Sequence, residues 1–172
     1  KIDKISCEKI SKNDIQRLKR IWEVYHSTGK KLSKWISLVT KEVKFNKKKH
    51  IYHFIKSLDY ISVLAVMKNK KIPIVKQFRP AIEKYVWEFP GGLVDKKLSL
   101  KKIAIDEIKE ETGLTVEKII KMKTCYSDLG RIINKIHFFY AECSNKINPV
   151  KDKYIKVKFV NYNNLVKLIK EN

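Results

Sequence analysis

The spacing of apolar residues changes along the chain and predicts a mixed α/β fold. The continuous apolar run at 60–67 predicts a buried strand, a lysine-rich turn at 68–71 follows it, and 72–78 is expected to return as its hairpin partner. Alternating or short apolar runs predict the other strands, at 34–45, 50–57, 82–89, 115–126, 132–142 and 154–160.

Apolar residues that recur every three or four positions predict helices at 11–26, 100–112 and 163–171. Ser99 precedes the central helix as an N-cap, and Gly113 follows it where a left-handed residue is favoured. Asn163 is expected to cap the last helix. The elements together predict a mixed sheet with flanking helices, organised as a helical extension over 1–28 and a main domain over 29–172.

Composition places the chain among globular proteins, with 44% hydrophobic residues in a length of 172. No run of about 18 apolar residues predicts a membrane span, and the N-terminal segment lacks the apolar core of a signal peptide. The cysteines Cys7, Cys125 and Cys143 are far apart and form no CxxC pair. We therefore expect an intracellular, cytoplasmic protein without a membrane segment, a disulfide framework or a zinc site.

The chain carries a net charge of +21, from 35 lysines and four arginines opposed by 18 acidic residues. Lysines release counterions from phosphate backbones, so one interpretation is RNA binding. The other interpretation is compositional bias, because the lysines are scattered and selective phosphate readers are more often arginines. The second interpretation is favoured, and in either case the charge draws anionic substrates toward the protein.

The central predicted helix carries acidic residues on its apolar side. At about 100° per residue, Glu107 and Glu111 fall within the stripe of Ile103 and Ile108, with Glu110 at the edge of that stripe. Two carboxylates four positions apart repel each other, and these lie at the helix end where the dipole favours cations. Because burial of an uncompensated carboxylate costs several kcal/mol, a positive charge is expected beside them.

Three arrangements would satisfy these carboxylates: a solvated acidic face, an ion pair with a lysine from elsewhere in the chain, or a divalent cation. The helical wheel argues against the first, since Lys102 and Lys109 mark the solvent side. Carboxylate oxygens are hard ligands that suit Mg²⁺ or Mn²⁺, which commonly share substrate phosphates. From the helix alone, the ion pair and the cation both stay open.

The segment from Gly92 to Leu114, GLVDKKLSLKKIAIDEIKEETGL, resembles the Nudix box. That box reads glycine, five residues, glutamate, seven residues, and then R-E-U-x-E-E-x-G-U, in which U is aliphatic. The residues that match at the required spacing are Gly92, Glu107, Ile108, Glu110, Glu111, Gly113 and Leu114. By this resemblance the chain is identified as a member of the Nudix hydrolase superfamily.

The resemblance extends outside the box. VKQFRP at 75–80 and WEFPGGLVD at 87–95 are similar to the ADP-ribose and nucleoside-diphosphate-sugar pyrophosphatase branch, as are the segments at 29–38 and 50–57. The resemblance implies an α/β/α sandwich that hydrolyses a diphosphate bridge with Mg²⁺ or Mn²⁺. For ADP-ribose the products would be AMP and ribose 5-phosphate, and the enzyme would be a homodimer.

The family pattern also implies roles for individual residues. Glu107 and Glu111 would bind magnesium ions that bridge the diphosphate, with Glu110 as a third ligand or as the group that orients the water. The backbone carbonyl of Gly91 would add a ligand, and Gly92 would lie against the substrate.

Three further residues are implied in substrate binding. Arg79 would contact a phosphate, a role that suits the bidentate guanidinium. Trp35 and Tyr52 would sandwich the adenine across a dimer interface, where such stacking contributes about 1–3 kcal/mol per base. The alternatives are a surface turn for Arg79, and core or edge-strand packing for each aromatic residue.

Some positions depart from the family pattern. Leu98 replaces a glutamate and Asp106 replaces an arginine, both of which brace the box in the family. Loss of such supporting residues weakens metal binding or activity by about 10–100-fold in other sites. Where the branch supplies a further catalytic glutamate, the alignment places the lysines and tyrosine of 153–156, with only Asp152 nearby.

Two functions from different classes follow. The intact glutamate trio favours an active Mg²⁺-dependent hydrolase of a nucleoside diphosphate sugar. The departures and the positive charge favour a degenerate Nudix domain that acts as a structural or RNA-associated binding module.

Overall fold

The computed structural model describes residues 22, 25–26, 36–150 and 155–171. The chain divides into two compact units, Lys1–Leu58 with Tyr126–Asn134, and Asp59–Cys125 with Lys135–Asn172. Only three residues of the predicted helix at 11–26 are among those described, so that prediction lies largely outside the described residues.

In its described part, the first unit is built on an antiparallel hairpin of β1 (Ile36–Phe45) and β2 (Lys48–Ser57). Asn46 and Lys47 form the turn at positive φ, 50° and 61°, as a tight two-residue hairpin loop requires. The amide of Ile55 donates to the Arg131 carbonyl at 2.8 Å, which ties the segment 126–134 to β2. The two predicted strands are confirmed, and β2 begins two residues earlier than predicted.

The second unit, in its described part, holds two sheets and two helices. The four-stranded sheet has the order β6 (Gly91–Leu93), β3 (Tyr60–Met67), β8 (Lys135–Ile147), β7 (Leu114–Tyr126), and β3 runs parallel to β8. The three-stranded sheet has the order β5 (Lys84–Glu88), β4 (Ile72–Arg79), β9 (Lys156–Val160), and both of its pairings are antiparallel. The helices are α3 (Leu100–Thr112) and α4 (Tyr162–Glu171).

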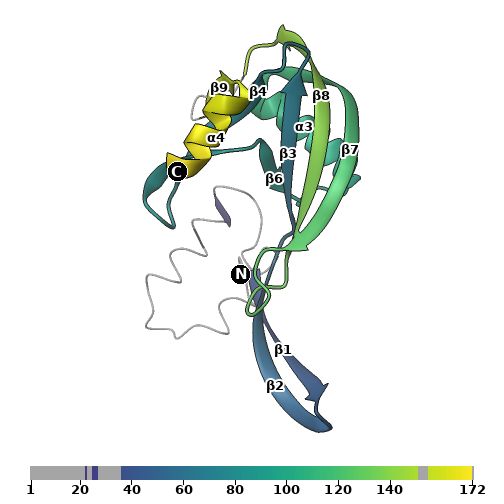
Figure 1. Ribbon diagram of the computed structural model, residues 1–172. Helices are drawn as coiled ribbons and strands as arrows, with labels where there is room; N and C mark the ends of the chain where they lie inside the picture. The colour runs from purple at the N-terminus through teal and green to yellow at the C-terminus, as the bar shows by residue number, and fades with distance from the viewer. Residues whose placement is uncertain (1–21, 23–24, 27–35, 151–154, 172) are drawn as a thin grey trace. The chain divides into compact units, whose positions relative to one another are not determined.

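Strand β3 separates two hydrophobic cores because its side chains alternate between them. Ile61 and Val63 are fully buried and belong to the core that includes Ile108 of α3. Leu64 and Val66 pack against a second core, which β4, β9 and α4 complete. Figure 1 shows α3 against the sheet of β3, β8 and β7, and α4 beside β4 and β9. This layering confirms the expected mixed α/β fold class.

The boundaries of α3 follow its sequence. Ser99 Oγ accepts a hydrogen bond from the Lys102 amide at 3.2 Å, as an N-cap does. Gly113 has a φ of 71°, and its amide donates to the Lys109 carbonyl at 3.1 Å, which satisfies one of the last free carbonyls. Both predicted ends of this helix are confirmed.

The predicted hairpin of 60–67 with 72–78 is wrong. The two strands belong to different sheets, although the Met67 amide donates to the Lys71 carbonyl at 2.9 Å and closes the turn. β3 instead pairs on both sides, with β6 and β8, because a strand that is apolar on both faces is best buried between two neighbours. The short strand β6 was not predicted at all.

The predicted cap of the last helix is also wrong. Asn161 Oδ1 accepts a hydrogen bond from the Asn164 amide at 2.9 Å, so the N-cap of α4 lies two residues before the predicted Asn163. The exposed Cys125 and the buried Cys143 are both free thiols. Among the described residues, no helix combines the length and apolar character needed to cross a membrane.

Gly113 offers a test of the turn that follows α3. A Cβ atom there would lie 2.0 Å from the Asn148 carbonyl oxygen, at a φ of 71°. We expect Gly113→Ala to lower the free energy of unfolding by more than about 1–2 kcal/mol, the cost of the left-handed conformation alone. Urea denaturation followed by circular dichroism measures this loss.

Gly130→Ala is the matched control, because its added Cβ would meet only Asp128 Oδ1, at 3.5 Å. This variant should change the free energy of unfolding by less than about 0.5 kcal/mol. Equal losses in the two variants would contradict a specific requirement for glycine at 113.

Candidate active site

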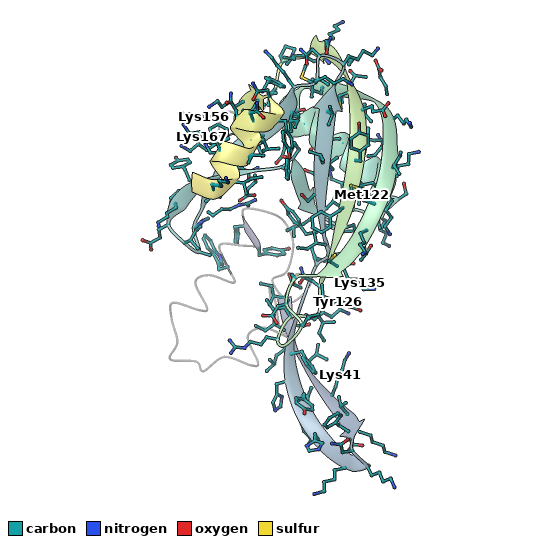
Figure 2. All side chains as sticks on the ribbon, viewed as in Figure 1. Lys41, Met122, Tyr126, Lys135, Lys156 and Lys167 are labelled. Carbon is teal, nitrogen blue, oxygen red and sulfur yellow. The ribbon has the colours of Figure 1, made fainter. Side chains whose placement is uncertain are left out.

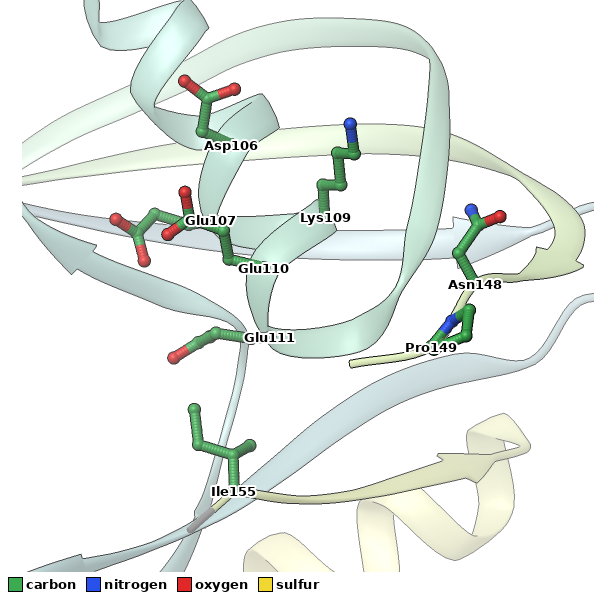
Figure 3. Close-up of a pocket in the computed structure, with 8 residues that line it drawn as sticks. All are labelled: Asp106, Glu107, Lys109, Glu110, Glu111, Asn148, Pro149 and Ile155. Carbon is green, nitrogen blue, oxygen red and sulfur yellow. The ribbon is translucent and has the colours of Figure 1, made fainter. Parts of the chain in front are cut away.

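Helix α3 places three glutamates on one cavity. Glu107, Glu110 and Glu111 lie in its last two turns and border a cavity of about 570 Å³ (Figure 3). Residues three and four apart lie on one side of a helix, which accounts for this grouping. The other residues that line the cavity are Asp106, Lys109, Asn148, Pro149 and Ile155.

Glu111 is the buried member of the trio, with 7% of its surface exposed. The Gln77 Nε2 amide of β4 donates to Oε1 at 2.7 Å, and the Gly91 backbone amide of β6 donates to Oε2 at 3.0 Å. Burial raises the pKa of the Glu111 carboxyl to about 7; these two hydrogen bonds oppose the rise and the charge of Glu107 adds to it. A carboxylate held in this way gains strongly from any cation that enters the cavity.

Glu107 lies half-buried against β6. A Cβ atom on Gly92 would come within 2.6 Å of Glu107 Cδ, so glycine at 92 leaves the space that this carboxylate occupies. Gly91 is needed for a separate reason, since its Cβ would lie 2.0 Å from the Ile61 carbonyl oxygen on β3. Burial, and then the charge of Glu110, raises the pKa of Glu107.

Glu110 is the exposed member of the trio: 63% of its side chain is exposed, and its Oε1 lies 3.9 Å from Lys96 Nζ. Among the described residues, no three histidine, cysteine, aspartate or glutamate side chains are gathered closely enough to hold a metal ion by themselves. The donors still fit a magnesium-type ion, which takes one or two carboxylates and completes its coordination with water and substrate phosphates. The raised pKa values of Glu107 and Glu111 identify the two carboxylates that such an ion would stabilise most.

A second polar group lies on the same side of β4 as Gln77. Arg79 Nε donates to Glu88 Oε1 at 2.8 Å and Arg79 Nη2 donates to Glu88 Oε2, so the pair is bidentate. Arg79 also shares a hydrogen bond with the hydroxyl of Tyr60, and its side chain is 38% exposed. The arginine predicted to contact phosphate therefore lies at the end of a strand, where two partners orient its guanidinium.

Sequence reasoning did not single out Gln77, Tyr60 or Glu88. A signal for Gln77 was present, since residues two apart on a strand share a face and Gln77 is two residues before Arg79. No local signal marked Tyr60 or Glu88, because Glu88 reaches Arg79 from the neighbouring strand β5 and Tyr60 reaches it from β3 of the other sheet.

The two departures in the box have different surroundings. Leu98 is 48% exposed. Asp106 lies on the cavity wall and pairs with Lys102 one turn earlier, with 2.6 Å between Nζ and Oδ1. An ion pair within α3 therefore offsets the charge of Asp106. This contact stands where the family pattern has an arginine at position 106 and a glutamate at position 98.

Tyr52 and Trp35 are the remaining predicted substrate residues. Tyr52 lies on β2 in the first unit, 44% exposed, with its ring centroid 6.1 Å from that of Phe54. Trp35 lies outside the described residues. Of the residues expected at the place of the downstream glutamate, Lys156 begins β9, whereas Asp152, Lys153 and Tyr154 lie outside the described residues. Ile155, which precedes β9, lines the cavity.

One protein family matches the part of the chain that forms this cavity. The pattern of the NUDIX domain matches residues 59–172, which include α3, β4, β6 and every residue that lines the cavity. The chain belongs to the Nudix family. A second family, described as IPP transferase, matches residues 1–75, less than half of the chain, and overlaps the Nudix match at β3, so it shows no second membership.

Several curated proteins are similar to this Nudix chain. An ADP-ribose pyrophosphatase of Bacillus subtilis is 33% identical over 113 residues, 63% of this chain and 61% of that protein. An ADP-ribose pyrophosphatase of Saccharomyces cerevisiae is 37% identical over 78 residues, 42% of this chain and 34% of that protein. An ADP-sugar pyrophosphatase of Mus musculus is 39% identical over 62 residues, 34% of this chain and 28% of that protein. The match thus spans less than two thirds of the length of each.

The raised pKa of Glu111 predicts how the stability of the metal-free Nudix domain depends on pH. The pKa rises from an ordinary 4.5 to about 7 on folding, so the native state disfavours the ionised carboxylate. At a pH below 4.5 the carboxyl is protonated in both the folded and the unfolded state. As the pH rises from there through about 7, the unfolded state ionises first, so the free energy of unfolding falls. The loss is on the order of 3 kcal/mol.

Thermal unfolding in EDTA between pH 5 and pH 8 measures this effect. We expect the melting temperature of the wild type to fall more than that of Glu111→Gln, which cannot ionise. Glu142→Gln, at an exposed carboxylate outside the cavity, is the control and should keep the wild-type slope. An identical pH dependence in Glu111→Gln and wild type would contradict the assignment.

Proposed function

We propose that this Nudix domain is a Mg²⁺- or Mn²⁺-dependent hydrolase of a nucleoside diphosphate sugar, with ADP-ribose as the leading substrate. The observation that carries the proposal is the Glu111 carboxylate, which is buried beside Glu107 at a cavity and has a raised pKa. Such a pair is costly in an apolar interior and is stabilised when a divalent ion and a diphosphate enter. The pyrophosphatase relatives support the same substrate class.

The proposed ligands of the ion are the carboxylates of Glu107, Glu110 and Glu111 and the backbone carbonyl of Gly91. When bound, a divalent ion of this kind neutralises the non-bridging oxygens of a diphosphate and lowers the pKa of a coordinated water. Gln77 holds Glu111 in one rotamer through the 2.7 Å hydrogen bond to Oε1, so this ligand needs no reorganisation.

The reaction is addition of water to one phosphorus of the diphosphate bridge, with cleavage of the bond to the bridging oxygen. ADP-ribose and water then give AMP and ribose 5-phosphate. Glu110, the exposed carboxylate of the cavity, is proposed to accept the proton from the attacking water. Arg79 is proposed to bind a phosphate oxygen, with its guanidinium oriented by Glu88 and Tyr60.

The adenine site is proposed to use Tyr52 and Trp35 of two copies of the chain. Four apolar side chains support association of two copies through the face of the β1–β2 hairpin opposite Tyr52: Ile36, Leu38, Ile51 and Ile55 are 52%, 60%, 70% and 43% exposed. An isolated two-stranded hairpin is marginally stable in water, and a second copy would bury this face.

The second candidate is a degenerate Nudix module that binds without catalysis. Loss of the bracing pair at Leu98 and Asp106 is the observation that favours it. The trio of glutamates with Gln77 in place favours the hydrolase, because a pure binding module has no need of a buried carboxylate with a raised pKa. Turnover assays separate the two candidates.

Glu111→Gln tests the hydrolase. With ADP-ribose and Mg²⁺, we expect kcat/KM to fall by more than about 100-fold, because loss of supporting residues alone costs about 10–100-fold in metal sites. Phosphate release from AMP and ribose 5-phosphate by a coupled phosphatase measures turnover. Mg²⁺ should also raise the melting temperature of the wild type more than that of the variant.

Glu142→Gln is again the matched control, since this glutamate pairs with Lys118 away from the cavity. It should leave kcat/KM within about twofold of the wild type. Absence of turnover by the wild type on ADP-ribose, other ADP-sugars and further nucleoside diphosphate sugars would contradict the hydrolase and support the binding module.

The dimer has its own test. Sedimentation equilibrium of the wild type should give a dimer, and Leu38→Lys with Ile51→Lys should shift it to monomer, because two charges would have to be buried. Val43→Lys with Phe45→Lys, on the opposite face of the hairpin, is the control and should stay dimeric. A monomeric wild type at micromolar concentration would contradict the dimer.

A further inference from the structure

One face of the β5–β4–β9 sheet carries rings and lysines at its outer end. The strand register places Lys76 opposite both Trp87 and Lys156, and Phe78 opposite Tyr85. Residues paired directly across strands lie on the same face, so these five share it. Lys158 joins them, two residues along β9 from Lys156. We call these six residues the ring–lysine face.

The inner end of the same face belongs to the second hydrophobic core, and Trp87 of the ring–lysine face also packs against that core. Ile74 and Val160 pack with Leu165 of α4 and form the second hydrophobic core. Beyond that core, Phe78 is 47% exposed and Tyr85 is 63% exposed. Two large rings on a regular sheet therefore contribute little to burial, although burial is the usual reason for an aromatic residue on a strand.

The rings and ammonium groups are interleaved. The Phe78 and Tyr85 centroids are 5.2 Å apart, with 57° between the ring planes. Lys76 Nζ lies 5.8 Å from the Tyr85 centroid and 5.6 Å from that of Trp87, and Lys158 Nζ lies 5.9 Å from that of Trp87. Each ring on β5 thus has an ammonium nitrogen within about 6 Å of its centroid, the spacing of a cation–π contact.

The charge on this face is uncompensated along its strands. Lys76 and Lys156 are direct cross-strand partners, an arrangement of like charges that destabilises a sheet. No acidic residue occupies this side of β4, β5 or β9 over their described lengths. Glu88 lies on the other side, where its carboxylate binds Arg79. Figure 2 draws these side chains as sticks and labels Lys156.

We propose that the ring–lysine face binds single-stranded nucleic acid. Exposed rings on a sheet stack on unpaired bases without regard to sequence, and lysines beside them contact the phosphates between those bases. A duplex hides its base faces and would leave the rings unused. An acidic protein segment would use the ammonium groups and leave the rings unused as well. The combination of the two groups favours the single strand.

This face is separate from the cavity of the proposed hydrolase. Gln77 and Arg79 lie on the face of β4 that turns toward Glu111, and they alternate with Lys76 and Phe78 on the opposite face. Substitutions on the ring–lysine face therefore leave the glutamate trio and its partners in place. Failure of one proposal leaves the other standing, because each has its own residues and its own measurement.

Fluorescence anisotropy of the full chain with a labelled 12-nucleotide poly(U) RNA, in 0.1 M KCl and EDTA, tests the rings. Phe78→Ala with Tyr85→Ala should weaken binding by about 5-fold to 150-fold for each ring that stacks on a base. The control is Phe45→Ala with Tyr162→Ala, which removes the same two ring types at sites that are 63% and 70% exposed. Circular dichroism checks that both double variants stay folded.

A second pair of double variants tests the lysines, and both double variants have the same net charge. Lys76→Gln with Lys156→Gln should reduce the slope of log affinity against log salt by about 1.4, or about 0.7 for each lost phosphate contact. Lys121→Gln with Lys123→Gln, on exposed positions of β7, removes the same charge and should leave the slope near that of the wild type.

The outcomes decide the proposal. The proposal is supported if the ring variant loses affinity and the first lysine pair lowers the salt slope while both controls stay unchanged. Glu111→Gln should bind the RNA as the wild type does. Equal weakening by the two lysine pairs, or unchanged affinity in the ring variant, overturns it in favour of general attraction to polyanions. Poly-glutamate that binds as tightly as RNA overturns it in favour of an acidic protein partner.

Discussion

The hydrogen-bonded Glu111 carboxylate is the contact on which the arrangement of the second unit depends. One oxygen accepts from Gln77 of β4 and the other from the Gly91 amide of β6, so strands from both sheets converge on a single side chain of α3. Burial of this carboxylate is unfavourable without those donors, and its pKa stays raised even with them. The packing that makes the core therefore also creates the demand for a cation at the cavity.

Strand β4 connects the chemistry of the cavity to the rest of the unit. Its alternation places Gln77 and Arg79 on the side of Glu111 and Glu88, while Ile74 packs under α4 on the opposite side. Both neighbours of β4 are antiparallel, and β5 supplies Glu88, which fixes the guanidinium of Arg79. One strand of eight residues therefore carries the partners of Glu111 and Glu88 on one face and core residues on the other.

The departures from the Nudix box alter the surroundings of the glutamates and leave the glutamates themselves in place. Asp106 adds a carboxylate to the cavity wall, and Lys102 offsets its charge within the same helix. Glycines set the remaining geometry: Gly92 leaves room for the Glu107 carboxylate, and Gly91 allows β6 to lie directly on β3.

Sequence by itself determined the elements with strong local signals. The period of α3, its Ser99 cap and the left-handed Gly113 fixed both helix ends, and the wheel predicted that Glu111 faces inward. Only the tertiary structure decided that β3 leaves its expected hairpin to pair in parallel with β8, and that Gln77 and Gly91 hold Glu111. Those contacts join residues at least 20 positions apart, and periodicity reports only the geometry of neighbouring residues.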